Sequence, residues 1–158
     1  MNGSVDITAA GARADDLVEA LAAVWEASVR ATHAFLTEDD VVALRPEARA
    51  GIAGVDVLEV ARLDGEPCGF SGVQDGKLEM LFVAPAARGC GVGKALLVRA
   101  IALHGATELD VNEQNPQAVG FYEHEGFAVA GRSPMDDAGR PFPLLHMRLA
   151  GGSEGRER

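Results

Sequence analysis

A glycine-rich loop at residues 88–93, which reads Arg-Gly-Cys-Gly-Val-Gly, is the first candidate for chemistry. It follows a run expected to be a strand, 77–83, and opens a run whose apolar residues recur at helical spacing. The first amides of a helix lack intrahelical acceptors, and the helix dipole adds positive potential there. Glycine allows a ligand to approach these amides closely, and Arg88 and Lys94 add charge. The loop therefore predicts a phosphate site, with a flexible surface turn as the alternative interpretation.

Residue spacing excludes two common phosphate loops. A Walker loop needs Gly-Lys-Ser/Thr, but Gly93 and Lys94 are followed by Ala95, and the earlier glycine position holds Arg88. A dinucleotide loop needs Gly-x-Gly-x-x-Gly, and neither possible register places a glycine at the last position.

A second segment, beginning at Asn115, has the signals of a complete short helix. Asn115 is a favourable N-cap, Pro116 suits the first helical position, and Gly126 is placed to end the helix. Ala118 and Tyr122 are four residues apart, so they share one helix face, and the small residue leaves room beside the aromatic hydroxyl.

Charge is unevenly distributed along the chain. The formal net charge is −10, which argues against a nucleic-acid partner. The stretch from Met80 to Thr107 nevertheless contains no Asp or Glu, while Arg88, Lys94 and Arg99 lie within it. This stretch is therefore a candidate for binding an anionic ligand.

Length and composition favour one soluble α/β domain. The chain has 158 residues, of which 47% are hydrophobic and 24% charged. No apolar run reaches the roughly 18 residues that span a bilayer, and the first ten residues do not resemble a signal peptide, so we expect a cytoplasmic protein with no membrane partner. Cys68 and Cys90 show neither disulfide nor metal-site spacing.

The periodicity predicts an order of strand, two helices, three antiparallel strands, helix, strand, helix and two strands. The strands are expected at 5–8, 57–63, 67–73, 77–83, 108–112, 127–131 and 144–149. Helices are expected from Asp15 or Asp16, from Thr37 with a capping box to Asp40, from 92 and over 116–125. Pro46 is expected to break or kink the second helix, 51–54 to be a loose joint, and 150–158 to be a disordered tail.

The two motifs resemble those of the GNAT (Gcn5-related) N-acetyltransferase family. Arg88, Gly91 and Gly93 fill the Arg/Gln-x-x-Gly-x-Gly/Ala pyrophosphate loop, and the segment from Asn115 to Phe127 matches the helix motif that follows it. Further segments, among them Ala-Thr-His-x-Phe-Leu around His33, resemble the YjaB branch of these bacterial proteins.

This resemblance implies an α+β fold in one domain, 1–149, whose mixed, mostly antiparallel sheet is flanked by helices and splays between the fourth and fifth strands. It also implies that acetyl-CoA lies with its pantetheine arm along 81–83 and its pyrophosphate on the amides of 89–95. The implied cofactor residues are Leu81, Phe82, Val83, Arg88, Gly89, Cys90, Gly91, Val92, Gly93, Lys94, Ala95, Asn115, Ala118, Phe121 and Tyr122.

The resemblance also suggests the acid and the base. Tyr122 would protonate the leaving thiolate, because a phenol with a pKa near ~10 is protonated at neutral pH; the alternative is that it is an ordinary core aromatic. Glu79, on the strand before the loop and expected on the face of Leu81, would accept the proton of the amine, or it is an exposed strand carboxylate. His33 and Glu113 are candidates for binding the substrate, although His33 also suits a helix-end cap.

The function that follows is acetyl transfer from acetyl-CoA to a primary amine, with no metal. A small-molecule amine is the leading acceptor because the chain is a minimal domain without an appended recognition module. The alternatives are a protein lysine or N-terminal amine, and a non-catalytic acyl-CoA-binding protein. The sequence allows either a monomer or a homodimer.

Overall fold

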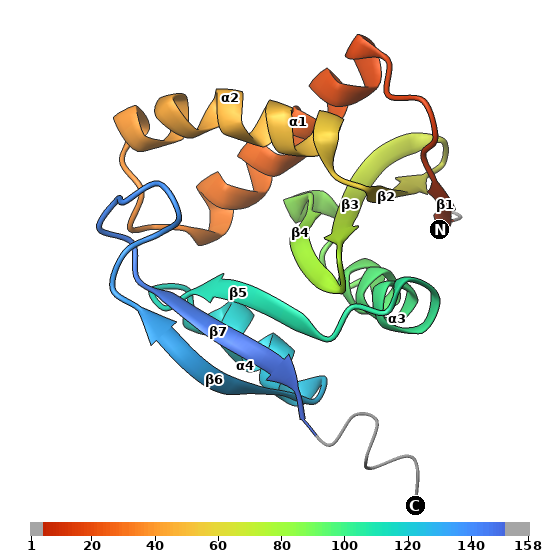
Figure 1. The fold of residues 1–158 in the computed structure, drawn as a ribbon. Coiled ribbons are helices and arrows are strands. Elements are labelled where there is room, and N and C mark those ends of the chain that lie inside the picture. Colours follow the sequence, from red (N-terminus) through yellow and green to blue (C-terminus); the bar gives the residue numbers. More distant parts are fainter. Residues whose placement is uncertain (1–4, 151–158) are drawn as a thin grey trace, which may run out of the picture. The chain divides into compact units, whose positions relative to one another are not determined.

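The computed structural model describes residues 5–150, and the chain folds as two compact units, Met1–Gly105 and Ala106–Arg158 (Figure 1). The single domain and the splay between the fourth and fifth strands stay predictions. All but the first residue of the predicted disordered tail lies outside the described residues.

The first unit contains a four-stranded antiparallel meander. Its strands are β1 (Val5–Ala9), β2 (Val57–Leu63), β3 (Glu66–Gln74) and β4 (Lys77–Val83), and each pairs with the next. Two-residue turns, Asp64-Gly65 and Asp75-Gly76, join the last three strands, and all four turn residues have positive φ. This is the hairpin geometry that the dipeptide Asp-Gly favours, and it confirms the predicted order of three consecutive antiparallel strands.

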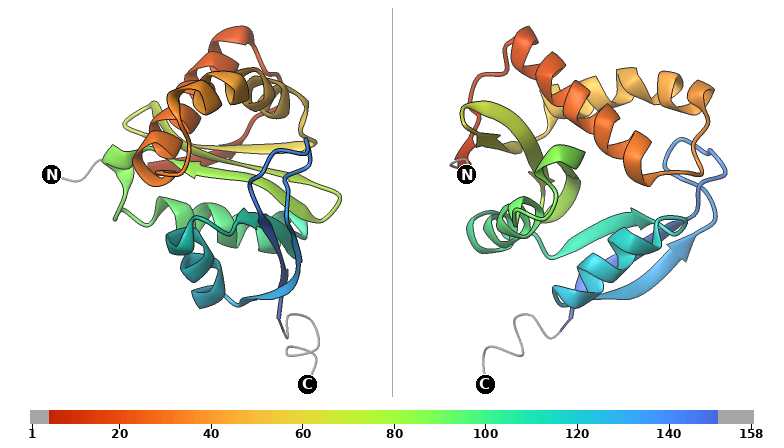
Figure 2. Two further views of the ribbon diagram at one scale, coloured as in Figure 1. Left: turned by 90° about the vertical axis from the view of Figure 1, so that its left-hand side faces the viewer. Right: turned by 180° about the vertical axis from the view of Figure 1, so that it is seen from behind.

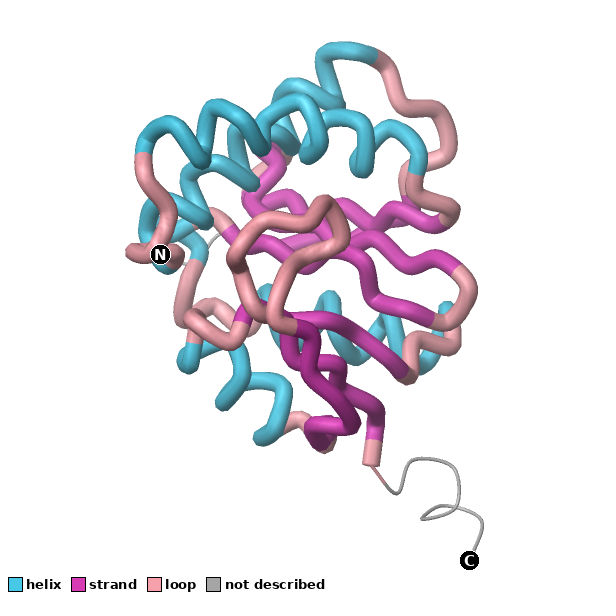
Figure 3. The backbone as a smooth tube through the Cα atoms, turned by 60° about the vertical axis from the view of Figure 1, so that its left-hand side comes forward, coloured by secondary structure: helices cyan, strands magenta, loops and turns pink. Residues whose placement is uncertain are grey.

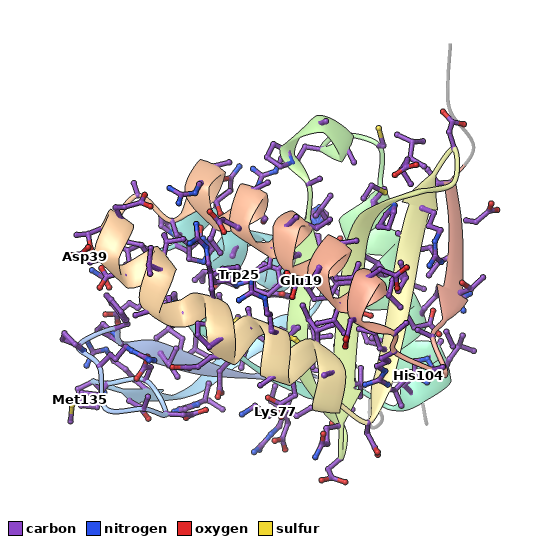
Figure 4. All side chains as sticks on the ribbon, turned by 90° about the horizontal axis from the view of Figure 1, so that it is seen from above. Glu19, Trp25, Asp39, Lys77, His104 and Met135 are labelled. Atoms are coloured by element: carbon purple, nitrogen blue, oxygen red, sulfur yellow. The ribbon has the colours of Figure 1, made fainter. Side chains whose placement is uncertain are left out.

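Helices cover both faces of this meander, as the left view of Figure 2 shows for the first unit. On one face α1 (Asp15–Thr32) and α2 (Glu38–Gly54) enclose a core that includes Leu21, Ile52 and Phe70, all fully buried. Trp25, labelled in Figure 4, lies in the same core. On the other face α3 (Val92–His104) packs Val92 and Leu96 against Ala61 and Cys68 of the strands.

The second helix differs from its prediction. Thr37 and Asp40 form the predicted capping box, through contacts of 3.1 and 2.9 Å. Pro46, however, lies inside a helix that continues to Gly54, so the loose joint expected at 51–54 is instead the last helical turn. Proline costs the helix one backbone hydrogen bond, but buried Val41 and Ile52 lie on either side of it, and their packing outweighs the local preference.

An ion-pair network joins α1 to α2. Arg45 donates to both oxygens of Glu26 at 2.6 and 2.7 Å, and Arg30 donates to Glu26 and to Glu38. The hydrogen bond from Arg45, helped by Arg30, lowers the pKa of Glu26 to about 2. The network fixes the two helix ends between which His33 lies.

A buried charged cluster joins α3 to β2. Glu59 is only 2% exposed, and it accepts hydrogen bonds from Arg99 at 2.5 Å and from His104 at 2.8 Å. Burial would raise the pKa of Glu59, but the two hydrogen bonds outweigh it and lower the pKa. Arg99 is therefore paired with Glu59. Of the three cations in the stretch predicted to bind an anionic ligand, Arg88 and Lys94 remain as candidates.

The second unit is a three-stranded antiparallel sheet with one helix. Its strands are β5 (Glu108–Asn112), β6 (Phe127–Ser133) and β7 (Leu144–Leu149), with β7 in the middle, and α4 (Pro116–His124) packs on one face (Figure 1). The bounds of β5 and β7 match the predictions, whereas β6 runs two residues further and α4 ends one residue earlier than expected. A long connection, drawn pink in Figure 3, joins β6 to β7 and carries Met135, labelled in Figure 4.

Candidate functional site

The glycine-rich loop forms an irregular turn that leads into α3. After β4, a short 3₁₀ helix η1 (Pro85–Ala87) precedes Arg88, and Gly89 and Gly91 have φ of +82° and +79°. Gly91 is the N-cap, and the first helical bond runs from the amide of Ala95 to its carbonyl, 3.0 Å away. The amides of residues 92–94 therefore begin the helix without intrahelical acceptors.

This loop is exposed, but it is anchored at both sides. Arg88, Gly91 and Lys94 are exposed, whereas Ala87 and Val92 are each 2% exposed and belong to the core under α3. A Cβ at Gly91 would meet nothing within 4 Å, so the space above the backbone is open and glycine is required there by the positive φ. Open space, helix amides and two cations together fit a pyrophosphate.

The strand before the loop departs from strict alternation. Phe82 packs in the α1–α2 core, while Leu81 and Val83 pack on the α3 side, so these three residues alternate between the two faces. Register shifts by one residue at Glu79, because Gly72 pairs with Met80 but Val73 pairs with Leu78.

This β-bulge corrects the sequence-based assignment of faces. Strict alternation along 77–83 predicts that Leu78 shares the face of Met80, and this prediction is wrong, because Leu78 pairs with Val73, which alternates with Gly72. The extra residue, Glu79, is exposed, and its role as a base stays a prediction.

His33 is the C-cap residue of α1, which agrees with the capping alternative. Burial, together with the charge of Arg88, lowers the pKa of His33 to about 4, so the ring is neutral at pH 7. The hydroxyl of Thr32 donates to the carbonyl of Ser28 at 2.8 Å and also lies 2.8 Å from Nδ1 of His33. Because the hydroxyl proton of Thr32 is used in the bond to Ser28, its oxygen accepts a hydrogen bond from Nδ1–H of His33. In the neutral ring the lone pair therefore lies on Nε2. His33 can therefore accept a hydrogen bond from an amine.

In the second unit, α4 begins and ends with the predicted capping residues, and Tyr122 lies among other aromatic side chains. The side chain of Asn115 accepts from the amide of Ala118 at 3.4 Å, and Gly126 has φ of +106° just past the helix end. The ring of Tyr122 contacts Phe121 and Phe127 with centroids 5.1 and 6.0 Å apart. Burial raises the pKa of Tyr122 above its ordinary value, which keeps the phenol protonated.

Glu113, the other candidate for amine binding, already has a partner. Arg132 donates to its two oxygens at 2.7 and 2.9 Å, and this hydrogen bonding lowers the pKa of Glu113. An incoming ammonium would have to compete with a bidentate guanidinium.

Sequence reasoning missed one polar cluster, made by Asp110, His146 and Ser133. Its members come from three strands of the second unit, so no local spacing joins them. Within residues 5–150 no group of side chains has the composition of a metal site, and no helix is long and apolar enough to cross a membrane.

Comparison with known proteins identifies the class. The family described as Acetyltransferase (GNAT) domain matches residues 55–129. The chain belongs to the GNAT acetyltransferase family, and it is an N-acetyltransferase by class.

Within the family, the chain is similar to YjaB. It is 39% identical to the peptidyl-lysine N-acetyltransferase YjaB of Escherichia coli strain K12, over 84% of this chain and 90% of the relative. It is 42% identical to the protein of the same name from Salmonella typhimurium, over 82% and 89%. The solution structure of apo-form YjaB from E. coli superposes with a TM-score of 0.82 at 37% identity, covering 93% of this chain and 98% of that one.

Proposed function

We propose that this chain transfers the acetyl group of acetyl-CoA to the side-chain amines of protein lysines. The loop at the start of α3 is the structural observation that supports the donor, because its open glycines, helix amides and exposed Arg88 and Lys94 suit a pyrophosphate. Similarity along more than four fifths of the chain to two peptidyl-lysine N-acetyltransferases supports the acceptor. It reverses the ranking of acceptors that we expected from the sequence.

The proposed reaction is direct attack of a neutral amine on the thioester. The amine first loses a proton, for which Glu79 is our candidate acceptor, acting through a water where it does not reach directly. The nitrogen then forms a bond to the acetyl carbon, the carbon–sulfur bond breaks, and Tyr122 protonates the departing thiolate. Burial raises the pKa of Tyr122, so the phenol is protonated at neutral pH, as a donor must be; the same burial makes it a weaker acid than an exposed phenol.

An acceptor screen tests the proposal. Coenzyme A release is measured with acetyl-CoA and three sets of amines: lysine-containing peptides, matched peptides with each lysine replaced by arginine, and small amines and free amino acids. We expect release with the lysine peptides and none with the arginine peptides, since a guanidinium keeps its charge but is no nucleophile at neutral pH.

Two outcomes would contradict the proposal. Release with small amines alone would make a small molecule the acceptor. Binding of acetyl-CoA without release in any arm would indicate a non-catalytic acyl-CoA-binding protein.

A further inference from the structure

Three side chains on the second unit form a continuous hydrogen-bonded line across its sheet. Oδ1 of Asp110 on β5 lies 2.6 Å from Nδ1 of His146 on β7, and Nε2 of the same ring lies 2.6 Å from Oγ of Ser133 on β6. Gly131 pairs with His146, and a Cβ there would lie 3.6 Å from the ring, in ordinary van der Waals contact, so the imidazole extends across this position to reach Ser133.

The line lies on the sheet face opposite α4. Tyr122 of α4 contacts Phe127, and the register places Phe127, Met147 and Leu109 on that shared face. Asp110 and His146 alternate with these residues and so point the other way. The side chain of His146 is 39% exposed and Ser133 is half-buried, so neither the base nor the hydroxyl is sealed in the core.

The chemistry of the three side chains fixes their proton positions. An ionised carboxylate only accepts, so Nδ1 of His146 carries a proton and donates it to Asp110. In the neutral ring Nε2 then holds the lone pair, and the hydroxyl of Ser133 is the donor in the second contact. A nucleophile, a base within hydrogen-bond reach and a carboxylate that orients the base are the elements of serine acyl transfer, whatever the fold.

We propose that Ser133 is an acyl acceptor activated by His146 and Asp110, and that it is acetylated by acetyl-CoA or by an activated acetate ester. Oγ attacks the carbonyl carbon while its proton passes to Nε2. The carbon–sulfur or carbon–oxygen bond then breaks, and the leaving group takes that proton from the imidazolium. The products are O-acetylserine at 133 and the free thiol or alcohol, and water later hydrolyses the ester to acetate.

The proposal covers acylation and not rapid turnover. Fast release also requires donors that hold the oxyanion of each tetrahedral intermediate, and such donors are worth about 10²–10³ in rate. We therefore expect slow, stoichiometric labelling. The acetyl-CoA arm rests on the proposed function, whereas the ester arm does not, so failure of acetyl-CoA binding and failure of Ser133 are distinguishable.

The test incubates the full chain separately with p-nitrophenyl acetate and acetyl-CoA, and follows p-nitrophenol release and protein mass. Peptide mapping of the parent should place one acetyl group on Ser133, and hydroxylamine should remove it, because it cleaves esters but not the amides of acetyl-lysine. Ser133→Ala should abolish this label. His146→Gln should slow it by about 10²-fold or more, the usual contribution of a general base.

Glu108→Gln is the matched control, since it removes an exposed ion pair with Arg148 across the same two strands. It should label like the parent. A parent chain that carries no ester on Ser133 after both incubations would overturn the proposal, and so would His146→Gln that labels at the parent rate. The first of these results comes from the unaltered chain and needs no variant to fold.

Discussion

Replacing Tyr122 by phenylalanine separates the proposed chemistry from packing. The Tyr122 ring makes edge-to-face contacts with the rings of Phe121 and Phe127, and a phenylalanine at 122 retains both contacts. The ring volume is unchanged and only the hydroxyl is lost, so the free energy of unfolding should change by less than about 1 kcal/mol. Turnover should instead fall by about 10²–10⁴-fold, the usual contribution of a general acid, which corresponds to roughly 3–5 kcal/mol in activation free energy.

The assay is single-turnover acetylation of an accepted amine, beside calorimetric titration with acetyl-CoA and a thermal melt. Affinity for acetyl-CoA and stability should match the parent. Because burial raises the pKa of Tyr122, the parent rate should not decline on the alkaline side until well above pH 10, the ordinary range of a phenol. A variant rate within about threefold of the parent, with chemistry rate-limiting, would refute the role of the hydroxyl.

Two further predictions concern the loop and the buried cluster of the first unit. Gly91→Ala forces a side chain into a left-handed conformation at a cost of roughly 1–2 kcal/mol, and relief of that strain should turn the loop amides away from the ligand. Calorimetry should then show acetyl-CoA binding weakened on the order of tenfold, while Gly54→Ala should bind normally. Equal affinity of the two variants would contradict the phosphate assignment. Glu59→Gln should lower the free energy of unfolding at pH 7 by about 2 kcal/mol, with exposed Glu66→Gln as its control. Because the pKa of Glu59 is lowered in the folded state, its contribution to stability is present above about pH 4.3 and is lost as pH falls through the folded pKa. The free energies of unfolding of parent and Glu59→Gln should therefore converge in acid. A difference in free energy of unfolding that stays constant with pH would be inconsistent with a charged Glu59.

The parts of the fold that follow local rules were predictable from the sequence. Alternation located β4, β5 and β7 to the residue, and the Asp-Gly turns fixed the hairpins through their need for positive φ. The short helix α4 was also predictable, because Asn115 and Gly126 cap its ends through backbone groups close to them in sequence.

The errors arise where distant residues decide. The loose joint expected at 51–54 is wrong, because α2 continues past Pro46 to Gly54, with Val41 and Ile52 on either side of the proline buried against other elements. The bulge at Glu79 depends on how β3 pairs with β4, which no pattern within either strand reveals. Arg99 looked available for a ligand until Glu59, forty positions earlier in the chain, was found beside it.

The attachment of α3 bears on how a ligand is bound at its start. Val92 and Leu96 fix the first turn in the core, and Arg99 and His104 hold the second half of the helix to Glu59. The helix is therefore held along its length before any ligand arrives, and little conformational entropy remains to be lost when an anion meets its amides. A mobile loop would lose conformational entropy on binding, and that loss would weaken its affinity for the ligand. Because α3 is already ordered, its contacts with Glu59 and the core, well away from the phosphates, should slow dissociation of the bound ligand.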